Sequence, residues 1–282
     1  MNKNPIVDST YKNWSEEEEE LKRQQRELED SIQYASYIQT AIMPTVRDFS
    51  KVFPESFIFF QPKNVVSGDF YWFTKRKKEI IIAAADCTGH GVPGAFMSLL
   101  GMSFLNEIVS HDMLPTASSI LNKLREKVMK ALHQTGEGSE QKDGMDIALC
   151  IINTEMDELQ FAGAFNPLLL FREGKLIELK ADRMPIGIHA TEELSFTNHT
   201  LGLEANDMIY IFTDGFVDQF GGPDGKKFKQ RRFKGLLKST STRSIKKQEQ
   251  IVKDTFVDWK GKFEQVDDVL LMGFKYTCSS MV

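Results

Sequence analysis

The sequence predicts an α+β fold of layered, mostly antiparallel β-sheets, preceded by an N-terminal helix. Two patterns indicate it: short apolar segments separated by turn residues recur between residues 56 and 275, and helical stretches stand in groups between them. Grouped helices favour antiparallel layers over the regular strand–helix alternation of a parallel sheet. With 282 residues, 41% of them hydrophobic and 21 of them Phe, the chain can build a sizeable core.

The first predicted element is a helix over residues 15–43. Ser15 is a suitable N-cap, glutamates follow where they complement the helix dipole, and Pro44 ends the helix. Apolar residues recur along it at heptad spacing, at Leu21, Leu28, Ala35 and Ile42. Because Gln25 and Gln39 interrupt this coiled-coil seam, two interpretations stay open: a homodimer through residues 15–43, and a helix docked on its own domain.

After Pro44 the pattern changes to short strands and helices. We predict helices over residues 93–110, 116–133, 229–238 and 244–259, and strands over 56–61, 69–74, 79–86, 146–153, 158–163, 167–172, 175–179, 207–213 and 268–275. Gly174 supplies the turn of a hairpin. The longest apolar stretch, residues 92–105, is shorter than the roughly 20 residues that a membrane span needs, so we expect a buried helix and no membrane span.

Composition and charge argue against several classes of protein. The N-terminus lacks the basic and apolar segments of a secretory signal, and the three cysteines form neither a disulfide framework nor a zinc spacing. Both features indicate a cytoplasmic protein. The net charge of −5 argues against a general nucleic-acid binder, although residues 226–247 are strongly basic. That segment is either a solvated surface or a flap over a cleft that attracts an acidic phosphoprotein.

Acidic residues stand at the ends of four apolar strands. Asp69 begins "DFYWF", Asp86 ends "IIIAAAD", Asp214 ends "MIYIFTD", and Asp267 and Asp268 begin "DDVLLMGF". Neighbouring strand ends can bring such residues together, and buried unpaired carboxylates are costly unless a cation neutralises them. Oxygen ligands without a Cys or His cluster favour Mg²⁺ or Mn²⁺, and several carboxylates favour a pair of ions. Each aspartate alone would also suit a helix cap or a turn.

Four segments together resemble a known family. In order, "VVSGDFYWF", "ADCTGHGVPGAFMSLLG", "IFTDGFVD" and "DDVLLMGF" resemble the SpoIIE-like, RsbU-type branch of the PPM metal-dependent serine/threonine protein phosphatases. The resemblance implies a sandwich of two antiparallel β-sheets flanked by helices, with two Mn²⁺ or Mg²⁺ ions between the strand ends. It also implies hydrolysis of phosphoserine or phosphothreonine on a protein by water that the two ions activate.

The resemblance assigns the metal ligands residue by residue. Asp86, as the catalytic residue at the centre of the site, would bridge both ions. Asp69 and the backbone carbonyl of Cys87 would hold one ion, and Asp214 and Asp267 would hold the other. The strand that ends at Asp86 opens directly into a glycine-containing turn. The resemblance explains this arrangement, because Asp86 would then lie between two metals.

Three further positions receive candidate roles, Lys63 and Phe165 from the resemblance and His90 from the mechanism that it implies. Lys63 lies near the place where eukaryotic relatives have a phosphate-binding arginine, so it is the candidate substrate contact. His90 is either a proton donor to the leaving oxygen or a turn residue, and Gly89 and Gly91 allow the tight turn around it. Phe165 stands where many members have a histidine, and we expect it to pack in the interior.

The remaining aspartates of the motifs lie outside the main ligand set. Asp268 would act from the outer shell, and Asp143 or Asp146 would hold a third, loosely bound ion or serve as a turn or strand-start residue. The predicted domain organisation is a disordered N-terminus, a linker or dimerisation helix, a PPM-type phosphatase domain and a tail, over residues 1–14, 15–43, 44–276 and 277–282.

The resemblance also implies the partner. In this family the substrate is often a STAS-type antagonist of an anti-sigma factor, dephosphorylated in bacterial stress signalling by partner switching. A catalytically inactive phosphoprotein-binding module of the same fold is the alternative, but such a module would lack ligands, and none is missing here. A nucleic-acid binder would interleave aromatic residues with lysines, whereas most aromatic residues here fall in apolar strands.

Overall fold

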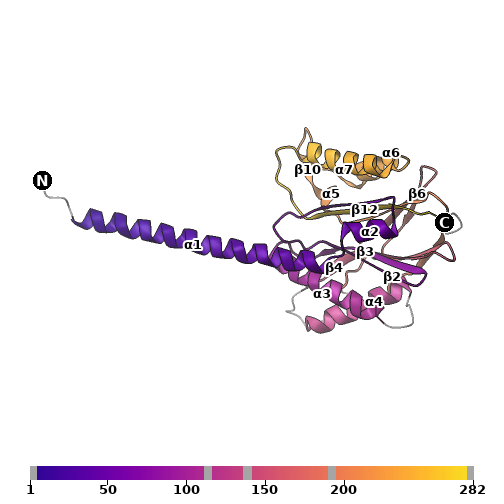
Figure 1. The fold of residues 1–282 in the computed structure, drawn as a ribbon, viewed down its shortest axis with the longest axis horizontal. Helices are drawn as coiled ribbons and strands as arrows, with labels where there is room; N and C mark the ends of the chain where they lie inside the picture. Colours follow the sequence, from indigo (N-terminus) through magenta and orange to yellow (C-terminus); the bar gives the residue numbers. More distant parts are fainter. Residues whose placement is uncertain (1–4, 111–115, 136–141, 190–194, 278–282) are drawn as a thin grey trace.

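The protein is a two-layer β-sandwich with a long helix projecting from it. A computed structural model describes residues 5–110, 116–135, 142–189 and 195–277. Two antiparallel five-stranded sheets pack face to face, and helices cover both outer faces (Figure 1). This architecture confirms the predicted α+β sandwich and its N-terminal helix. Most of the predicted tail lies outside the described residues.

The two sheets have the strand orders β1-β12-β9-β6-β7 and β2-β3-β4-β5-β8, and β10 pairs with β11 in a separate hairpin. The described strands are β1 Ser56–Gln61, β2 Phe70–Arg76, β3 Glu79–Cys87, β4 Met145–Asn153, β5 Glu158–Ala164, β6 Leu168–Arg172, β7 Lys175–Leu179, β8 His199–Gly202, β9 Met208–Phe212, β10 Phe220–Gly221, β11 Lys226–Lys227 and β12 Val269–Lys275. The described helices are α1 Pro5–Ile42, α2 Val46–Val52, α3 Val92–Val109, α4 Ala117–Ala131, α5 Gly215–Asp218, α6 Gln230–Thr240 and α7 Ile245–Lys260.

The predicted strands and the helices predicted after Pro44 all occur, with ends that differ by two residues or fewer. The sequence analysis missed α2, α5, β8, β10 and β11. All five are short, and β10 and β11 have two residues each. Their segments are too short for hydrophobic periodicity to identify them.

Alternating side chains explain why the central strands are apolar throughout. In β9, Met208, Tyr210 and Phe212 belong to the cluster under α6 and α7, whereas Ile209 and Ile211 belong to the cluster between the sheets. Strand side chains alternate between faces, so covering both faces requires an apolar residue at every position. The same arrangement holds β9 rigidly where it leads toward Asp214.

Helix α3 is, by length and composition alone, apolar enough to cross a membrane. Half of it is buried inside the fold, where it lies against α4 and β3. Its apolar composition therefore matches the predicted role of a core helix in a domain. Within the described residues it is the one helix with these properties.

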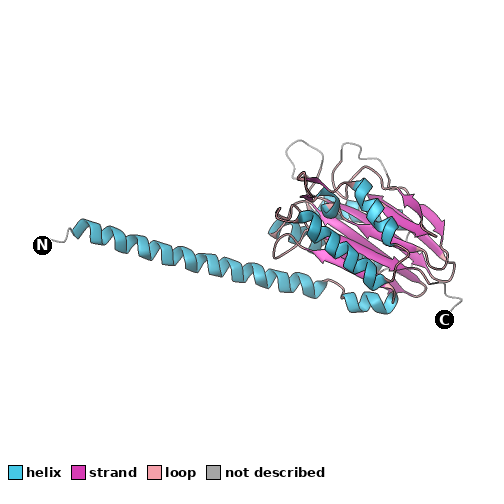
Figure 2. Cartoon of the chain, turned by 90° about the horizontal axis from the view of Figure 1, so that it is seen from above, coloured by secondary structure: helices cyan, strands magenta, loops and turns pink. Residues whose placement is uncertain are grey.

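Helix α1 begins at Pro5, ten residues before the predicted start of the helix at residue 15. Proline lacks an N–H but is tolerated in the first turn of a helix, where that group has no intrahelical acceptor. Most of α1 extends away from the sandwich, and its C-terminal end contacts the body, at α3 and at the loop that contains Ser67 (Figures 1 and 2). Leu21 and Leu28 are 66% and 61% exposed. Docking on the domain therefore explains the contacts at the end of the helix, but it leaves the leucines of the heptad seam exposed.

We predict that α1 associates with α1 of a second copy, because a projecting helix with exposed seam leucines gains stability by burying them. The chain should sediment as a dimer of the 32.2 kDa protomer. Leu21→Glu/Leu28→Glu should make it monomeric, whereas Arg26→Gln/Gln33→Glu, with the same change in charge, should leave the dimer intact. A wild-type chain that is monomeric throughout the concentration range would contradict the prediction.

Candidate metal centre

The four aspartates predicted as metal ligands come from both sheets. Asp69 directly precedes β2, Asp86 lies near the end of β3, Asp214 is the N-cap residue of α5 after β9, and Asp267 lies two residues before β12. Strand β3 contacts both β9 and β12 across the sandwich. The ends of these strands therefore meet at one edge of the molecule.

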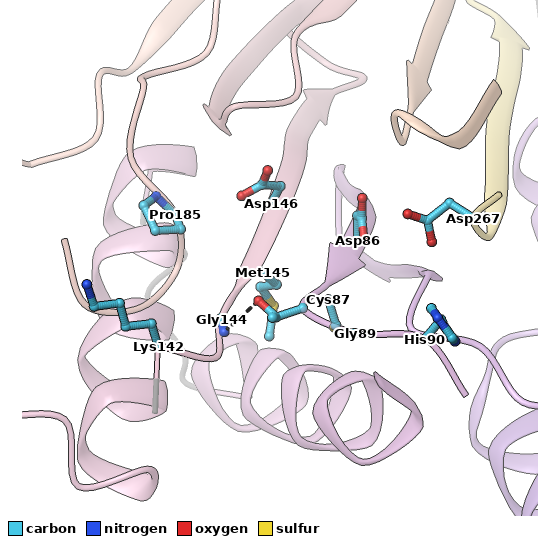
Figure 3. A pocket seen from close by; sticks show the side chains of 11 residues that line it. Asp86, Cys87, Gly89, His90, Lys142, Gly144, Met145, Asp146, Pro185 and Asp267 are labelled. Carbon is cyan, nitrogen blue, oxygen red and sulfur yellow. Dashed lines mark hydrogen bonds between the residues drawn. The ribbon is translucent and has the colours of Figure 1, made fainter. Parts of the chain in front are cut away.

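A pocket of about 280 Å³ opens at this edge (Figure 3). The carboxylates of Asp86, Asp146 and Asp267 lie around it, with His90 on one side and Lys142 on the other. A small pocket with three aspartates in its lining differs from the larger apolar clefts that bind drug-sized ligands. Its chemistry suits a small charged group.

The predicted ligands lie within electrostatic reach of one another. Burial, and then the charges of Asp69, Asp214 and Asp267, raise the pKa of Asp86 to about 10. Burial also raises the pKa of Asp69, which is 1% exposed, although the Thr213 hydroxyl opposes this shift by donating a hydrogen bond at 2.6 Å. Each aspartate is thus penalised, when ionised, by burial and by its neighbours.

The pKa values of Asp214, which lies outside the pocket lining, and of Asp146, which lines it, are raised in the same way. Burial raises the pKa of Asp214. The charges of Asp218 and Asp267 raise this pKa further, and a hydrogen bond with Asp86 opposes the shift. Burial raises the pKa of Asp146 to about 7, with a further contribution from Asp214. Asp146 and Asp86 are register partners on β4 and β3, so their strands bring them to the same edge.

These residues fit a centre of divalent cations. No ion pair between described residues involves Asp69, Asp86, Asp214 or Asp267. Buried acids without a basic partner are stabilised by hard cations, which prefer oxygen ligands. Within the described ranges, no three His, Cys, Asp or Glu side chains already stand close enough to enclose an ion, so binding requires the side chains to turn inward.

Glycines let the loop after β3 pack closely beside the pocket. Gly89 and Gly91 have φ angles of 85° and 68°, as the predicted tight turn requires. A Cβ atom on Gly94 would lie 2.2 Å from the carbonyl oxygen of Gly89, and one on Gly68 would lie 3.1 Å from that of Cys87. Cys87 also lines the pocket. The backbone carbonyl predicted as a ligand therefore lies at the end of β3, directly before a loop that packs closely on its neighbours.

Asp268 stabilises the loop that leads to Asp69. It is buried, and its two carboxylate oxygens accept hydrogen bonds from the backbone N–H groups of Lys63 at 2.6 Å and Gly68 at 2.8 Å. These contacts use both oxygens within the protein and agree with the predicted role outside the ligand set. Asp268 fixes the approach of this loop to the end of β12.

Two cationic candidates lie on the Asp267 side of the pocket. Burial raises the pKa of Asp267, and the charges of Lys63 and His90 are among the effects that oppose this shift. Nδ1 of His90 lies 3.1 Å from Oδ1 of Asn64, and His90 lines the pocket. Lys63 and His90 therefore both act electrostatically on Asp267, and of the two His90 lines the pocket whereas Lys63 does not.

Gln39 is a contact that the sequence analysis did not foresee. Its amide donates to the carbonyl oxygen of Ser67 at 2.6 Å and to Oγ of Ser98 at 2.8 Å, and its Oε1 accepts from the N–H of Ser67 at 3.1 Å. It therefore joins α1 to α3 and to the loop two residues before Asp69. The sequence signal that could have indicated this contact was the polar Gln39, which interrupts the apolar seam of the helix.

Two other expectations about the pocket need correction. Phe165 is 45% exposed and has a φ of 56°, because the chain turns outward immediately after β5, so it does not pack in the interior. The basic segment does not cover the pocket: none of residues 226–247 lines it, because α6 packs on the outer sheet face through Phe233 and Leu237. Of the two candidates for a third ion, Asp146 lines the pocket and Asp143 does not.

Comparison with known proteins identifies the family. The family model for stage II sporulation protein E, SpoIIE, matches residues 76–277. The chain belongs to the SpoIIE family. This result confirms the resemblance drawn from the four motifs, all but the first of which fall within the matched range.

Similar proteins agree with this assignment. The chain is 26% identical over 208 residues to phosphoserine phosphatase RsbU of Bacillus subtilis (strain 168), covering 72% of this chain and 58% of RsbU. The SiaA-PP2C domain of Pseudomonas aeruginosa is 31% identical to this chain, with a TM-score of 0.81. The match covers 89% of this chain and 98% of that domain. The PP2C phosphatase domain of SpoIIE with a regulatory fragment, from Bacillus subtilis, shares the fold at 17% identity, with a TM-score of 0.63 and coverage of 79% and 61%.

The raised pKa values predict how the metal-free protein responds to pH. Aspartates ionise near pH 4 in the unfolded chain but only at higher pH in the folded one, so stability should fall as pH rises from about 4 toward 10. Asp86→Asn removes one such group and should raise the melting temperature of the metal-free protein at about pH 8. Asp224→Asn, at a 73% exposed side chain, is the control. Equal stability of wild type and Asp86→Asn across this range would contradict the prediction.

The contacts of Gln39 predict an effect on metal binding. Gln39→Ala leaves the polar groups of Ser67 and Ser98 without this partner, which should cost about 1–3 kcal/mol of stability and loosen the loop before Asp69. Calorimetric titration with Mn²⁺ should therefore give weaker binding than in wild type. Gln33→Ala, at an exposed position of α1, is the matched control. Unchanged Mn²⁺ affinity in a folded Gln39→Ala protein would show that the contact does not position the site.

Proposed function

We propose that the protein is a Mn²⁺- or Mg²⁺-dependent serine/threonine protein phosphatase. The observation that carries the proposal is that Asp86 and Asp267 line one pocket, while Asp69 and Asp214, from two further strand ends, lie close enough to raise the pKa of Asp86. Membership of the SpoIIE family and similarity to a phosphoserine phosphatase support it. The chain spans 58% of that curated relative, so the activity of the whole relative is itself part of the proposal.

The protein's residues divide into two ligand groups in this proposal. Asp86 would help to hold both ions, Asp69 and the carbonyl of Cys87 would hold one ion, and Asp214 and Asp267 would hold the other. When bound, such a pair of divalent cations activates water and neutralises charge on a transferring phosphoryl group. Asp146, at the rim of the pocket, is the better placed of the candidates for a third, looser ion.

Lys63 and His90 act on the substrate in this proposal. Both lie near Asp267, where Lys63 would contact a phosphate oxygen and His90 would donate a proton to the serine oxygen that leaves. Asn64 holds the imidazole through its amide oxygen. Neither role requires a covalent phosphoenzyme, since the attacking group is water.

The identity of the partner follows from the resemblance and not from the site. We propose a phosphorylated STAS-type antagonist of an anti-sigma factor as substrate, in the cytoplasm, and homodimerisation through residues 15–43. RsbU is described as a phosphoserine phosphatase, and one structural neighbour combines RsbU and RsbW domains. These similarities support a substrate in a partner-switching pathway. Direct action on nucleic acid is not part of the proposal.

Phosphate release tests the proposal. Wild-type protein should hydrolyse para-nitrophenyl phosphate and a phosphoserine peptide with Mn²⁺ and lose this activity with a chelator. Asp267→Asn should reduce kcat by at least about 100-fold, because one ligand of the ion pair is weakened. Asp224→Asn, at an exposed acid of the β10–β11 turn, should retain wild-type turnover.

The result also decides between an enzyme and a binding module. A folded protein that binds the phosphoserine peptide but releases no phosphate at any Mn²⁺ or Mg²⁺ concentration would favour the catalytically inactive alternative. Wild-type turnover by Asp267→Asn would remove the proposed ligand set.

A further inference from the structure

A basic surface borders the candidate metal centre on the side of α5. The stretch from residue 218 to residue 247 contains ten Lys and Arg residues and two Asp residues, although the whole chain has a net charge of −5. Four of these cations are adjacent in sequence and are called the basic surface below: Lys226, Lys227, Lys229 and Arg231. They come from β11, the connection to α6 and the first turn of α6.

Backbone hydrogen bonds place this surface beside a predicted metal ligand. The N–H of Lys229 donates to the carbonyl oxygen of Val217 at 2.8 Å, and the N–H of Asp218 donates to that of Asp214 at 2.9 Å. Helix α5 is a single turn that begins after Asp214, and one helical turn rises about 5.4 Å. Lys229 is therefore attached about one helical turn from the Asp214 backbone.

Two cations of the basic surface have acidic neighbours that leave them available. Nζ of Lys227 lies 2.7 Å from Asp218, with both side chains 40% or more exposed. Nζ of Lys226 lies 3.5 Å from Asp224, and these side chains are 67% and 73% exposed. Exposed pairs of this kind contribute little free energy and are easily exchanged for another anion. Asp218 and Asp224 therefore compete only weakly with an incoming acidic group for these two lysines.

The other two cations have no such partner. Lys229 and Arg231 are exposed, and neither takes part in an ion pair among the described residues. Lys229 also has a φ of 71°, which glycine adopts at lower cost than a residue with a Cβ atom. The adjacent Phe228 is buried, so the chain turns sharply to return from the core and present Lys229 to solvent.

Electrostatics give these cations a task that the pocket cannot perform alone. The pocket is small and would take the phosphoryl group, so it offers no binding surface to acidic residues that flank the phosphate. A positive surface next to the pocket attracts such a segment without entering the reaction. The net charge of −5 argues against a nucleic-acid duplex as the occupant.

We propose that the basic surface of Lys226, Lys227, Lys229 and Arg231 binds an acidic segment of the phosphoprotein next to the phosphorylated residue. The inference rests on the proposed phosphatase function and deepens it by naming the substrate class: phosphoserine or phosphothreonine flanked by Asp or Glu. The surface acts on binding and specificity and does not touch the reacting atoms.

Two synthetic phosphoserine peptides test this inference, one flanked by glutamates and one by glutamines at the same positions. Wild type should show a kcat/KM about 10-fold higher for the glutamate peptide, through a lower KM, and this preference should shrink as salt is raised. The triple variant Lys226→Glu/Lys229→Glu/Arg231→Glu should abolish or invert the preference. Its turnover of para-nitrophenyl phosphate should stay within about twofold of wild type, because no catalytic residue has changed.

A matched triple variant, Lys75→Glu/Lys78→Glu/Lys175→Glu, is the control for net charge. Lys75 and Lys78 lie by the turn between β2 and β3, at the opposite end of β3 from Asp86, and Lys175 begins β7. This control should keep the wild-type preference between the peptides. Equal preference in wild type and in the basic-surface variant would overturn the inference.

Peptide binding separates this inference from the proposed function. Fluorescence anisotropy of the labelled glutamate peptide measures docking even in a protein that releases no phosphate. The basic-surface variant should bind it about 10-fold more weakly than wild type and the control variant. If wild type showed no Mn²⁺-dependent turnover, the proposed phosphatase activity would be refuted, but the peptide-docking result would still hold. Binding of a DNA duplex at this surface, tighter than that of the peptide at physiological salt, would instead overturn the docking inference.

Discussion

The burial of several carboxylates close to one another, and then their mutual repulsion, governs the functional edge of this molecule. Asp69, Asp86, Asp214 and Asp267 come from strands of both sheets, raise one another's pKa values and have no basic partner in an ion pair within the described chain. Such an arrangement opposes folding unless protons or cations neutralise it. The apolar strands and the covering helices hold the acids together against this repulsion, and divalent cations offset it while supplying chemistry.

The support for the site extends well beyond the carboxylates. The loop that leads to Asp69 is held by Asp268 from β12, by Gln39 from α1 and, at the aspartate itself, by the Thr213 hydroxyl. These contacts reach the loop from one sheet, from the projecting helix and from the end of β9. Direct hydrogen bonds from Gln39 therefore connect α1 to Ser67, the residue next to Gly68.

Sequence patterns predicted most of the fold because its central elements are long, apolar and bounded by clear turn residues. The convergence of the aspartates was also predictable, since each stands at the end of an apolar run. The contacts of Gln39 and Thr213 were not, because one polar residue in an amphipathic helix or at a strand end does not reveal its partner. The early start of α1 was missed because residues 5–14 lack periodicity, and the exposure of Phe165 because a φ of 56° cannot be read from "AGAFNPL".

The account depends on these four aspartates forming a centre for two divalent cations. Crystals grown with Mn²⁺ and measured at the manganese absorption edge test this directly, since anomalous scattering locates the metal without reference to activity. Two peaks should appear in the pocket, with Asp86 between them, Asp69 beside one and Asp214 and Asp267 beside the other. An anomalous map from these crystals that shows no peak at this edge of the sandwich, or that shows manganese bound only elsewhere, would contradict the account.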